Sequence, residues 1–380
     1  MRGFHLASGI PPQTATTLLA GCFAAAMFLS GCGGLPGALR QPFAPVQSDV
    51  ARGAVALTVP HYAPLPAHRD RNRSSMSPNS LATKRLFYVG DDDTNDVYIY
   101  NYKSGKSLGT LTGFDGPYGM CVDGKGDIYI ANFDAGNLVE YAHGGTTLLN
   151  TYESGGTPIG CSIGPNGDVA VTSFDPGEVT VYPGGNPSKG TTYSDSSCTY
   201  LWTMGYDRSG DLVGTSETSS GGRAYCALLS GSKSMTLLTT SGITINFPGG
   251  TSWDGKYIVL GDQEAGGTYQ AGLARATLKG TTLTFVSETV LSDDCYNDYT
   301  DVVNPFFVGK TNTLFHGKQA KAVIGANLWC PDGGQGKVDW WHYPAGGLPY
   351  KKFASSSDPY GAAVSLGNSN TASYSKGRQR

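Results

Sequence analysis

The chain has 380 residues, of which 54 are glycine and 22 are tyrosine, and only 15% are charged. An average soluble protein has about 7% glycine and about 25% charged residues, and a coiled coil or long helical bundle needs far more Ala, Glu, Lys and Leu, so the composition excludes those classes. A formal net charge of −3 supplies no excess of cations for phosphate groups, so no nucleic acid partner is expected.

An apolar run covers residues 18–29 near the start of the chain. A helix of that length spans about 18 Å, too short for a hydrocarbon core of about 30 Å, so the run predicts the apolar part of a signal peptide. The next residues, Leu29-Ser30-Gly31-Cys32, resemble the bacterial lipobox. This resemblance implies a lipoprotein signal peptide over residues 1–31 and a lipid on Cys32, which would hold the protein in the bacterial cell envelope, exposed to the periplasm or cell surface. An ordinary cleaved signal is the alternative.

Residues 32–83 follow as a proline-rich segment without apolar periodicity, and we expect a flexible tether there. Its basic cluster at residues 68–73 either touches anionic headgroups or is simply solvated. The last residues, 367–380, are expected to be a disordered tail, with a β-propeller over residues 84–366 between the two.

A sequence repeat of about 41 residues is the strongest signal in the chain. Residues 116–132 align with residues 158–173. Strand-like segments also end at Tyr100, Tyr141 and Tyr182, and successive tyrosines of this set are 41 residues apart. Each unit predicts short strands joined by glycine-rich turns. One such sheet cannot bury both faces, but copies arranged around an axis can, so the repeat predicts an all-β propeller.

Six blades are expected, with seven as the alternative count, and the sixth carries an insertion near residues 317–336. Residues 358–364 resemble the first strand of a blade, and only the first blade lacks that strand. We therefore expect the C-terminal strand to close the ring noncovalently. The expected blades are residues 85–113, 116–152, 157–193, 198–239, 243–289 and 297–355.

At this point the sequence resembles the NHL-repeat propellers, whose unit the second blade matches almost throughout and the third matches well. The resemblance implies the fold but hardly any function, because the superfamily includes scaffolds, lactonases and lyases.

Six cysteines lie within the expected propeller, and an even number in an exported domain indicates disulfides. Cys121 and Cys161 are placed on the first strands of adjacent blades, so they can meet. Cys198 with Cys226, and Cys295 with Cys330, would each pair within one blade. Free buried thiols are the alternative.

Polar residues recur just after the second strand of each unit and would form a rim around one end of the channel: Asp91, Asn132, Ser173, Ser216 and Asp262. This mildly acidic rim could bind a ligand rich in hydroxyl groups, or Ca²⁺ or another divalent ion. The alternative is that these side chains cap strand ends by accepting hydrogen bonds from the backbone. The five tryptophans could stack on sugars, although packing between blades is the commoner role.

No nucleophile elbow is expected, because residues 105–109 and 160–164 read G-x-S-x-G but lie in the β-strand repeat and not at a strand-to-helix turn, and there is no H-E-x-x-H. The histidines do not repeat on the inner strands, and His143 is expected on the outer side. We therefore expect no catalytic residue and a noncatalytic binding or scaffold protein. Its partners would be the membrane, through the lipid, and a protein or polysaccharide, and the chain would be a monomer. A metal-dependent hydrolase, such as a lactonase, or a lyase using the acidic rim is the alternative.

Overall fold

The computed structural model describes residues 73–265, 270–292, 306–308, 322–327, 336–356 and 359–367. The chain divides into two units, residues 1–53 and 54–380, and all described residues belong to the second. These residues are almost entirely β-strands, arranged in six sheets of four or five strands. No helix within this described part is long and apolar enough to cross a membrane.

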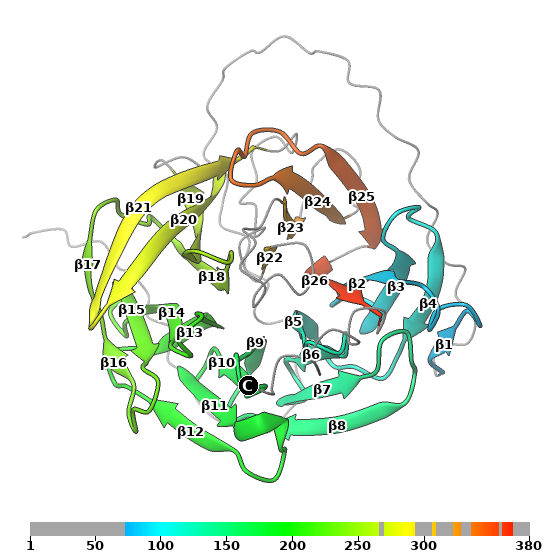
Figure 1. Cartoon of the computed structure of the whole chain (residues 1–380), viewed down its shortest axis with the longest axis horizontal. Helices are drawn as coiled ribbons and strands as arrows, with labels where there is room; N and C mark the ends of the chain where they lie inside the picture. The colour runs from blue at the N-terminus through cyan, green and yellow to red at the C-terminus, as the bar shows by residue number, and fades with distance from the viewer. Residues whose placement is uncertain are drawn as a thin grey trace, which may run out of the picture. The chain divides into compact units, whose positions relative to one another are not determined.

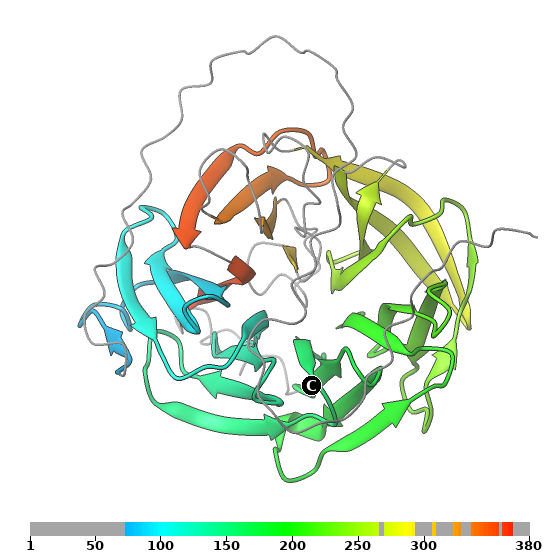
Figure 2. The same ribbon diagram turned by 180° about the vertical axis from the view of Figure 1, so that it is seen from behind.

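The strands follow one another along the chain in sheet-sized groups (Figures 1 and 2). The first sheet contains β1 (Ser75–Met76), β2 (Arg85–Asp91), β3 (Asp96–Asn101), β4 (Ser107–Leu111) and β26 (Pro359–Leu366). The second contains β5 (Pro117–Val122), β6 (Ile128–Asn132), β7 (Asn137–Tyr141) and β8 (Leu148–Glu153). The third contains β9 (Pro158–Ile163), β10 (Val169–Ser173), β11 (Glu178–Tyr182) and β12 (Thr191–Ser194), with a short 3-10 helix η1 (Pro183–Gly185).

The fourth sheet contains β13 (Tyr200–Tyr206), β14 (Leu212–Glu217), β15 (Arg223–Leu228) and β16 (Thr236–Leu237). The fifth contains β17 (Thr239–Ser241), β18 (Pro248–Trp253), β19 (Ile258–Ala265), β20 (Gln270–Lys279) and β21 (Thr282–Leu291). The sixth contains β22 (Phe306–Val308), β23 (Ala322–Asn327), β24 (Gly336–His342) and β25 (Lys351–Ser356). Neighbouring strands pair antiparallel, except that β17 lies parallel to β21.

The first strand of each sheet contacts the first strand of the next. These contacts run from β26 to β5, β9, β13, β18 and β22, and β22 contacts β26 again. In Figure 1 the sheets follow one another around a common centre. The arrangement is β-propeller-like, and it gives each sheet a neighbour on both faces, as the repeat predicts.

The turns between first and second strands explain why the repeat folds in this way. In the second sheet, Asp123 Oδ1 accepts hydrogen bonds from the backbone N–H groups of Lys125 and Asp127 at 2.9 Å. Gly126 takes φ of +93°, a conformation that L side chains rarely adopt. Asp207 repeats these contacts in the fourth sheet, with Gly210 at φ of +87°.

The C-terminal strand closes the ring, as the sequence predicts. β26 pairs antiparallel with β2 from Arg85↔Leu366 to Asp91↔Pro359, so the two ends of the fold share one sheet. A Cβ atom on Gly361 would collide with the carbonyl oxygen of Tyr118 on β5, so the close approach of the first and second sheets requires glycine there.

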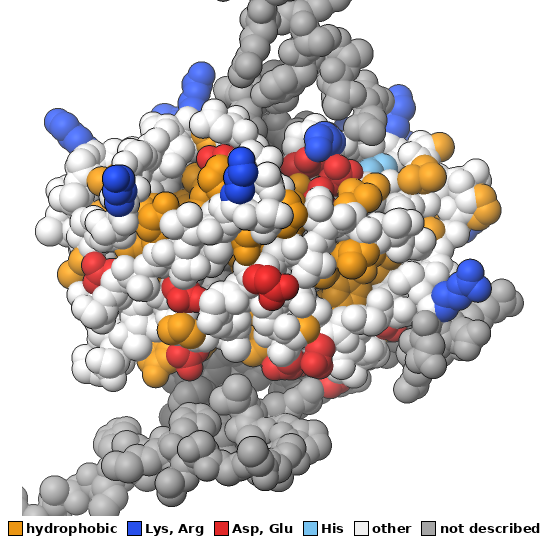
Figure 3. All heavy atoms as spheres, turned by 90° about the horizontal axis from the view of Figure 1, so that it is seen from below, with side chains coloured by type: hydrophobic (Ala, Val, Ile, Leu, Met, Phe, Trp, Pro, Cys, Tyr) orange, Lys and Arg blue, Asp and Glu red, His pale blue; other side chains and the backbone are white. Residues whose placement is uncertain are grey.

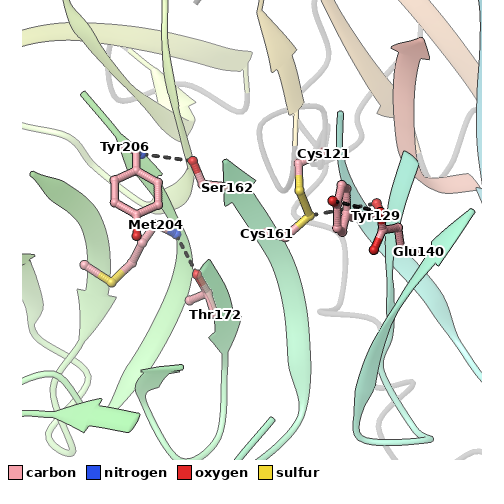
Figure 4. The surroundings of a disulfide bond; sticks show 8 residues. All are labelled: Cys121, Tyr129, Glu140, Cys161, Ser162, Thr172, Met204 and Tyr206. Carbon is pink, nitrogen blue, oxygen red and sulfur yellow. Dashed lines mark hydrogen bonds between the residues drawn. A yellow bond between two sulfur atoms is a disulfide. The ribbon is translucent and has the colours of Figure 1, made fainter. Parts of the chain in front are cut away.

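Apolar side chains fill the spaces between sheets, and a few polar side chains fix their register. Thr172 Oγ1 accepts a hydrogen bond from the Met204 N–H at 3.0 Å, and Ser162 Oγ accepts one from the Tyr206 N–H at 3.0 Å (Figure 4). Both bonds join the third sheet to the fourth. Thr203 Oγ1 likewise accepts the Thr251 N–H at 2.8 Å and joins the fourth sheet to the fifth.

Two disulfides are among the pairings that the sequence predicts. Cys121–Cys161 joins β5 to β9, and thus the second sheet to the third (Figure 4). Cys198–Cys226 joins the segment just before β13 to β15, so it lies within the fourth blade. Cys295 and Cys330 lie outside the described residues. Disulfides persist in oxidising compartments, so this is an extracytoplasmic protein.

Three expectations need correction. The expected tether ends too late, because β1 pairs with β4 and the Ser80 hydroxyl donates to the Gly144 carbonyl at 2.9 Å; residues 73–83 therefore pack on the first and second sheets. The expected insertion contains β23, which pairs with β22 and β24 as the second strand of the sixth sheet. His143 is not on the outer surface but is buried beside the ring closure, with Nδ1 2.6 Å from Ser365 Oγ.

Several predictions concern residues that the structure does not describe. The signal peptide, Cys32, the tether before residue 73 and the tail from residue 368 lie outside the described ranges.

Candidate functional site: an aromatic and acidic mouth

The antiparallel topology gives the ring two ends of different composition. The mouth is the end of the ring at which the first strand of each sheet begins and the second strand ends. The base is the opposite end, which carries the turns between first and second strands and between third and fourth strands. The pairing of Pro117 with Asn132 and of Pro248 with Asp262 places these residues at the mouth. All five rim residues expected from the sequence therefore lie at the mouth.

The structure places these five side chains in the interior, with exposed fractions of 6% or less. Asp262 accepts backbone N–H bonds from Asn246 at 2.8 Å and from Phe247 and Glu264 at 2.9 Å. Asp91 Oδ1 accepts the N–H of Thr94 at 2.8 Å, and Asn132 Oδ1 accepts the N–H of Asp115 at 2.6 Å. Three of the five thus hold the loops of the mouth in place. That they also bind a ligand stays a prediction.

The remaining two rim residues differ from each other. The Ser216 hydroxyl contacts the carbonyl oxygens of Tyr200 and Glu217, at 3.0 and 3.1 Å. Ser173 Oγ is buried and has no hydrogen-bond partner among the described residues.

Aromatic side chains lie beside the rim residues, and among them only Trp202 was considered from the sequence. In one group, Phe174 packs against Tyr200 and Trp202, with ring centroids 5.5 and 5.1 Å apart, and Trp202 packs edge-on against Phe247 at 6.2 Å. This group spans the third, fourth and fifth sheets. All four side chains are partly exposed, Phe247 by 37%.

A second aromatic group joins the first sheet to the second. Tyr118 stacks on Tyr360 with centroids 4.2 Å apart and on Phe133 at 4.6 Å, and all three side chains are partly exposed. Phe133 and Phe174 occupy equivalent positions, 41 residues apart, each directly after a rim residue. That recurrence was the sequence signal for these two residues.

Carboxylates surround the aromatic groups. Burial raises the pKa of Glu217, which lies opposite Tyr200 in the β13–β14 ladder. Burial, together with the charge of Asp115, raises the pKa of Asp134, and burial raises the pKa of Glu178, which lies opposite Ser173 in the β10–β11 ladder. A cation at the mouth would relieve the penalty that these groups pay for ionisation.

Within the part of the chain that the structure describes, no three His, Cys, Asp or Glu side chains are placed together to hold a metal ion. His143 contacts Ser365, and its Nε2 lies 2.7 Å from the carbonyl oxygen of Thr83. His342 stacks on Tyr350 with ring centroids 4.2 Å apart. Both histidines lie at the base. The mouth therefore offers aromatic faces and carboxylates, a combination suited to binding.

Comparison with known proteins supports the fold. No family model and no curated protein matches the sequence. A chain in the crystal structure of a nidogen/laminin complex matches with a TM-score of 0.52 and 12% identity, covering 74% of this chain and 98% of that one. A hydrazine synthase of Kuenenia stuttgartiensis is also similar, with a TM-score of 0.47 and 14% identity over 75% of this chain and 80% of that one. A functionally unknown protein from Desulfotomaculum acetoxidans matches with a TM-score of 0.48 and 11% identity over 74% of this chain and 99% of that one. At 12% identity the likeness to the chain of the nidogen/laminin complex concerns the fold alone. Together with the two disulfides, it describes a β-propeller-like, extracytoplasmic protein.

Proposed function

We propose that this chain is an extracytoplasmic binding protein whose partner docks on the mouth of a six-bladed propeller. The observation that carries the proposal is the partly exposed aromatic group Phe174, Tyr200, Trp202 and Phe247, which continues across three sheets beside Glu217. Trp and Tyr are enriched where protein partners bind most strongly. Carboxylates next to aromatic faces favour positively charged groups, because both attract cations.

The partner that fits best is a polypeptide that presents Lys or Arg side chains, and a polysaccharide is the second candidate. In the proposed arrangement, Cys32 carries the lipid, the segment up to about residue 72 is the tether, and the ring stands outside the membrane. The NHL-like pattern of the second and third sheets supports this arrangement only as a scaffold, because such scaffolds serve many functions.

The test is a thermal-shift screen of the full chain against Lys- and Arg-containing peptides, neutral peptides and oligosaccharides. The basic peptides should raise the melting temperature, and Trp202→Ala should abolish the rise. Trp253→Phe is the matched control, because Trp253 pairs with Ile258 at the base. Retention of the rise in Trp202→Ala, or an equal rise with neutral peptides, would contradict the proposal.

An enzymatic role would show itself differently. Hydrolysis that depends on a divalent ion and disappears in Asp91→Ala with Asp262→Ala would replace the binding proposal with the hydrolase alternative. Those two carboxylates would then act beyond their bonds to the backbone.

A further inference from the structure

The base of the ring carries exposed cations on the turns of five successive sheets. They include the exposed side chains of Lys103, Lys125, Lys189, Arg208, Lys233 and Lys256. The Lys125 amine lies 4.0 Å from the Asp123 carboxylate, but the Lys125 side chain is 72% exposed, so the pair is weak. In the side view of Figure 3, Lys and Arg gather along one edge, and most Asp and Glu lie away from it.

The acidic residues of the base are largely committed to the turns. Asp168 Oδ1 accepts the Gly184 N–H at 2.7 Å, and Asp211 Oδ1 accepts the Ser230 N–H at 2.7 Å. Asp254 is buried and accepts bonds from two backbone N–H groups and, at 2.7 Å, from the Tyr343 hydroxyl. The acids therefore sit close to the backbone, whereas the longer Lys and Arg side chains extend into solvent.

Large apolar side chains are exposed at the same end. They are Leu81, Leu148, Leu149, Leu237, Leu348 and Tyr350, with exposed fractions from 45% to 66%. Leu81 lies before β2, Leu148 and Leu149 begin β8, Leu237 follows the turn after β15, and Leu348 and Tyr350 lie in the turn after β24. At the mouth, by contrast, the exposed large apolar residues are Ile243 and Phe247 among those described.

We propose that the base of the ring docks on an anionic lipid surface. Turns at one end of a ring lie roughly in one plane, so their cations face a flat surface together. Lys and Arg among exposed Leu and Tyr form the composition of an interfacial membrane site, in which cations meet headgroups and apolar side chains enter the acyl boundary. The exposed leucines favour lipid over a soluble polyanion, which would leave them in water.

Docking in this way would turn the acidic, aromatic mouth away from the membrane and toward solvent. The proposal does not depend on ligand binding at the mouth or on a lipid at Cys32, because it rests only on the base.

The test uses the full chain with Cys32→Ser, so that acylation cannot account for binding. All variants contain residues 1–31, so any binding through this segment is the same in each variant and does not affect the comparison between them. Co-sedimentation with phosphatidylcholine vesicles is compared with that in vesicles containing 30% phosphatidylglycerol. The variant Lys103→Gln/Lys189→Gln/Lys233→Gln removes three base cations. Its matched control, Ser196→Asp/Ser219→Asp/Thr244→Asp, makes the same change in net charge with exposed residues at the mouth.

The anionic vesicles should bind the protein more tightly than the neutral ones, and this difference should shrink as salt rises. Each lysine near an anionic surface contributes roughly a fivefold gain in affinity, so the lysine variant should lose on the order of 100-fold while the control stays near the parent. Leu148→Ser with Leu348→Ser should also weaken binding, even at low salt. Equal binding to both vesicles, equal loss in the control, or tighter binding to soluble heparin than to anionic vesicles would overturn the proposal.

Discussion

The disulfide between Cys121 and Cys161 should contribute much of the stability of the ring. It closes a loop with a sequence separation of 40 residues and joins two neighbouring sheets. In the chain-entropy model, cross-linking over that separation stabilises the fold by about 4 kcal/mol at 25 °C, chiefly by restricting the unfolded chain. Net stabilities of folded domains are about 5–15 kcal/mol, so Cys121→Ala/Cys161→Ala should remove a large share.

Urea unfolding followed by tryptophan fluorescence measures this loss. The matched control is Cys198→Ala/Cys226→Ala, whose separation of 28 gives about 3.6 kcal/mol by the same relation. The two variants should therefore fall within error of each other, although one bond joins two sheets and the other lies within one blade. A loss below about 1 kcal/mol for Cys121→Ala/Cys161→Ala, with the disulfide confirmed in the parent by peptide mapping, would refute the entropic reasoning.

Three further predictions test the ring and its interior. Gly361→Val should lower the melting temperature by displacing β26 from the Tyr118 backbone, and melting equal to that of the parent would contradict the tight closure. Burial lowers the pKa of His143, so the folded state favours the neutral imidazole. The free energy of unfolding should therefore be at its full value above the unfolded pKa of about 6.5 and should fall as the pH decreases below it. In His143→Gln, the urea midpoint measured from pH 7 to pH 5 should change less with pH than in the parent. Glu140→Gln should lower the free energy of unfolding by about 1–3 kcal/mol, because the buried Glu140 carboxylate accepts three hydrogen bonds, including one from Tyr129 at 3.0 Å, and an amide cannot accept them all. Tyr129→Phe removes one of these bonds and should lower the free energy of unfolding by less in the same urea assay.

The first prediction also bears on location. If the protein matured in a reducing compartment, Cys121 and Cys161 would be recovered as thiols. Recovery of the disulfide from the native source would agree with an extracytoplasmic protein.

The spacing of residues was enough to predict most of the architecture. A unit that returns every 41 residues with turn glycines and β-branched strands must bury both faces of each sheet, and neighbouring copies are the nearest surfaces available. The pairing of β26 with β2 follows from the same count, because residues 358–364 supply the one strand that the first unit lacks. The pairing of Cys121 with Cys161 follows from a separation of 40 residues, one fewer than the repeat, which places the two side chains on opposite faces of the first strands of adjacent units.

Only the tertiary structure decided what each end of the ring presents. For Asp91 and Asp262 the sequence leaves open a ligand site or the capping of strand ends, and the folded loops direct backbone N–H groups at both carboxylates and bury them, as capping requires. For Trp202 the sequence leaves open packing between blades or stacking on a ligand; in the fold it packs on Phe174 of the neighbouring sheet, and both side chains remain partly exposed. Local patterns specify which residues form strands. Exposure and contact between side chains far apart in sequence depend on how the sheets pack, and this is fixed only when the ring closes.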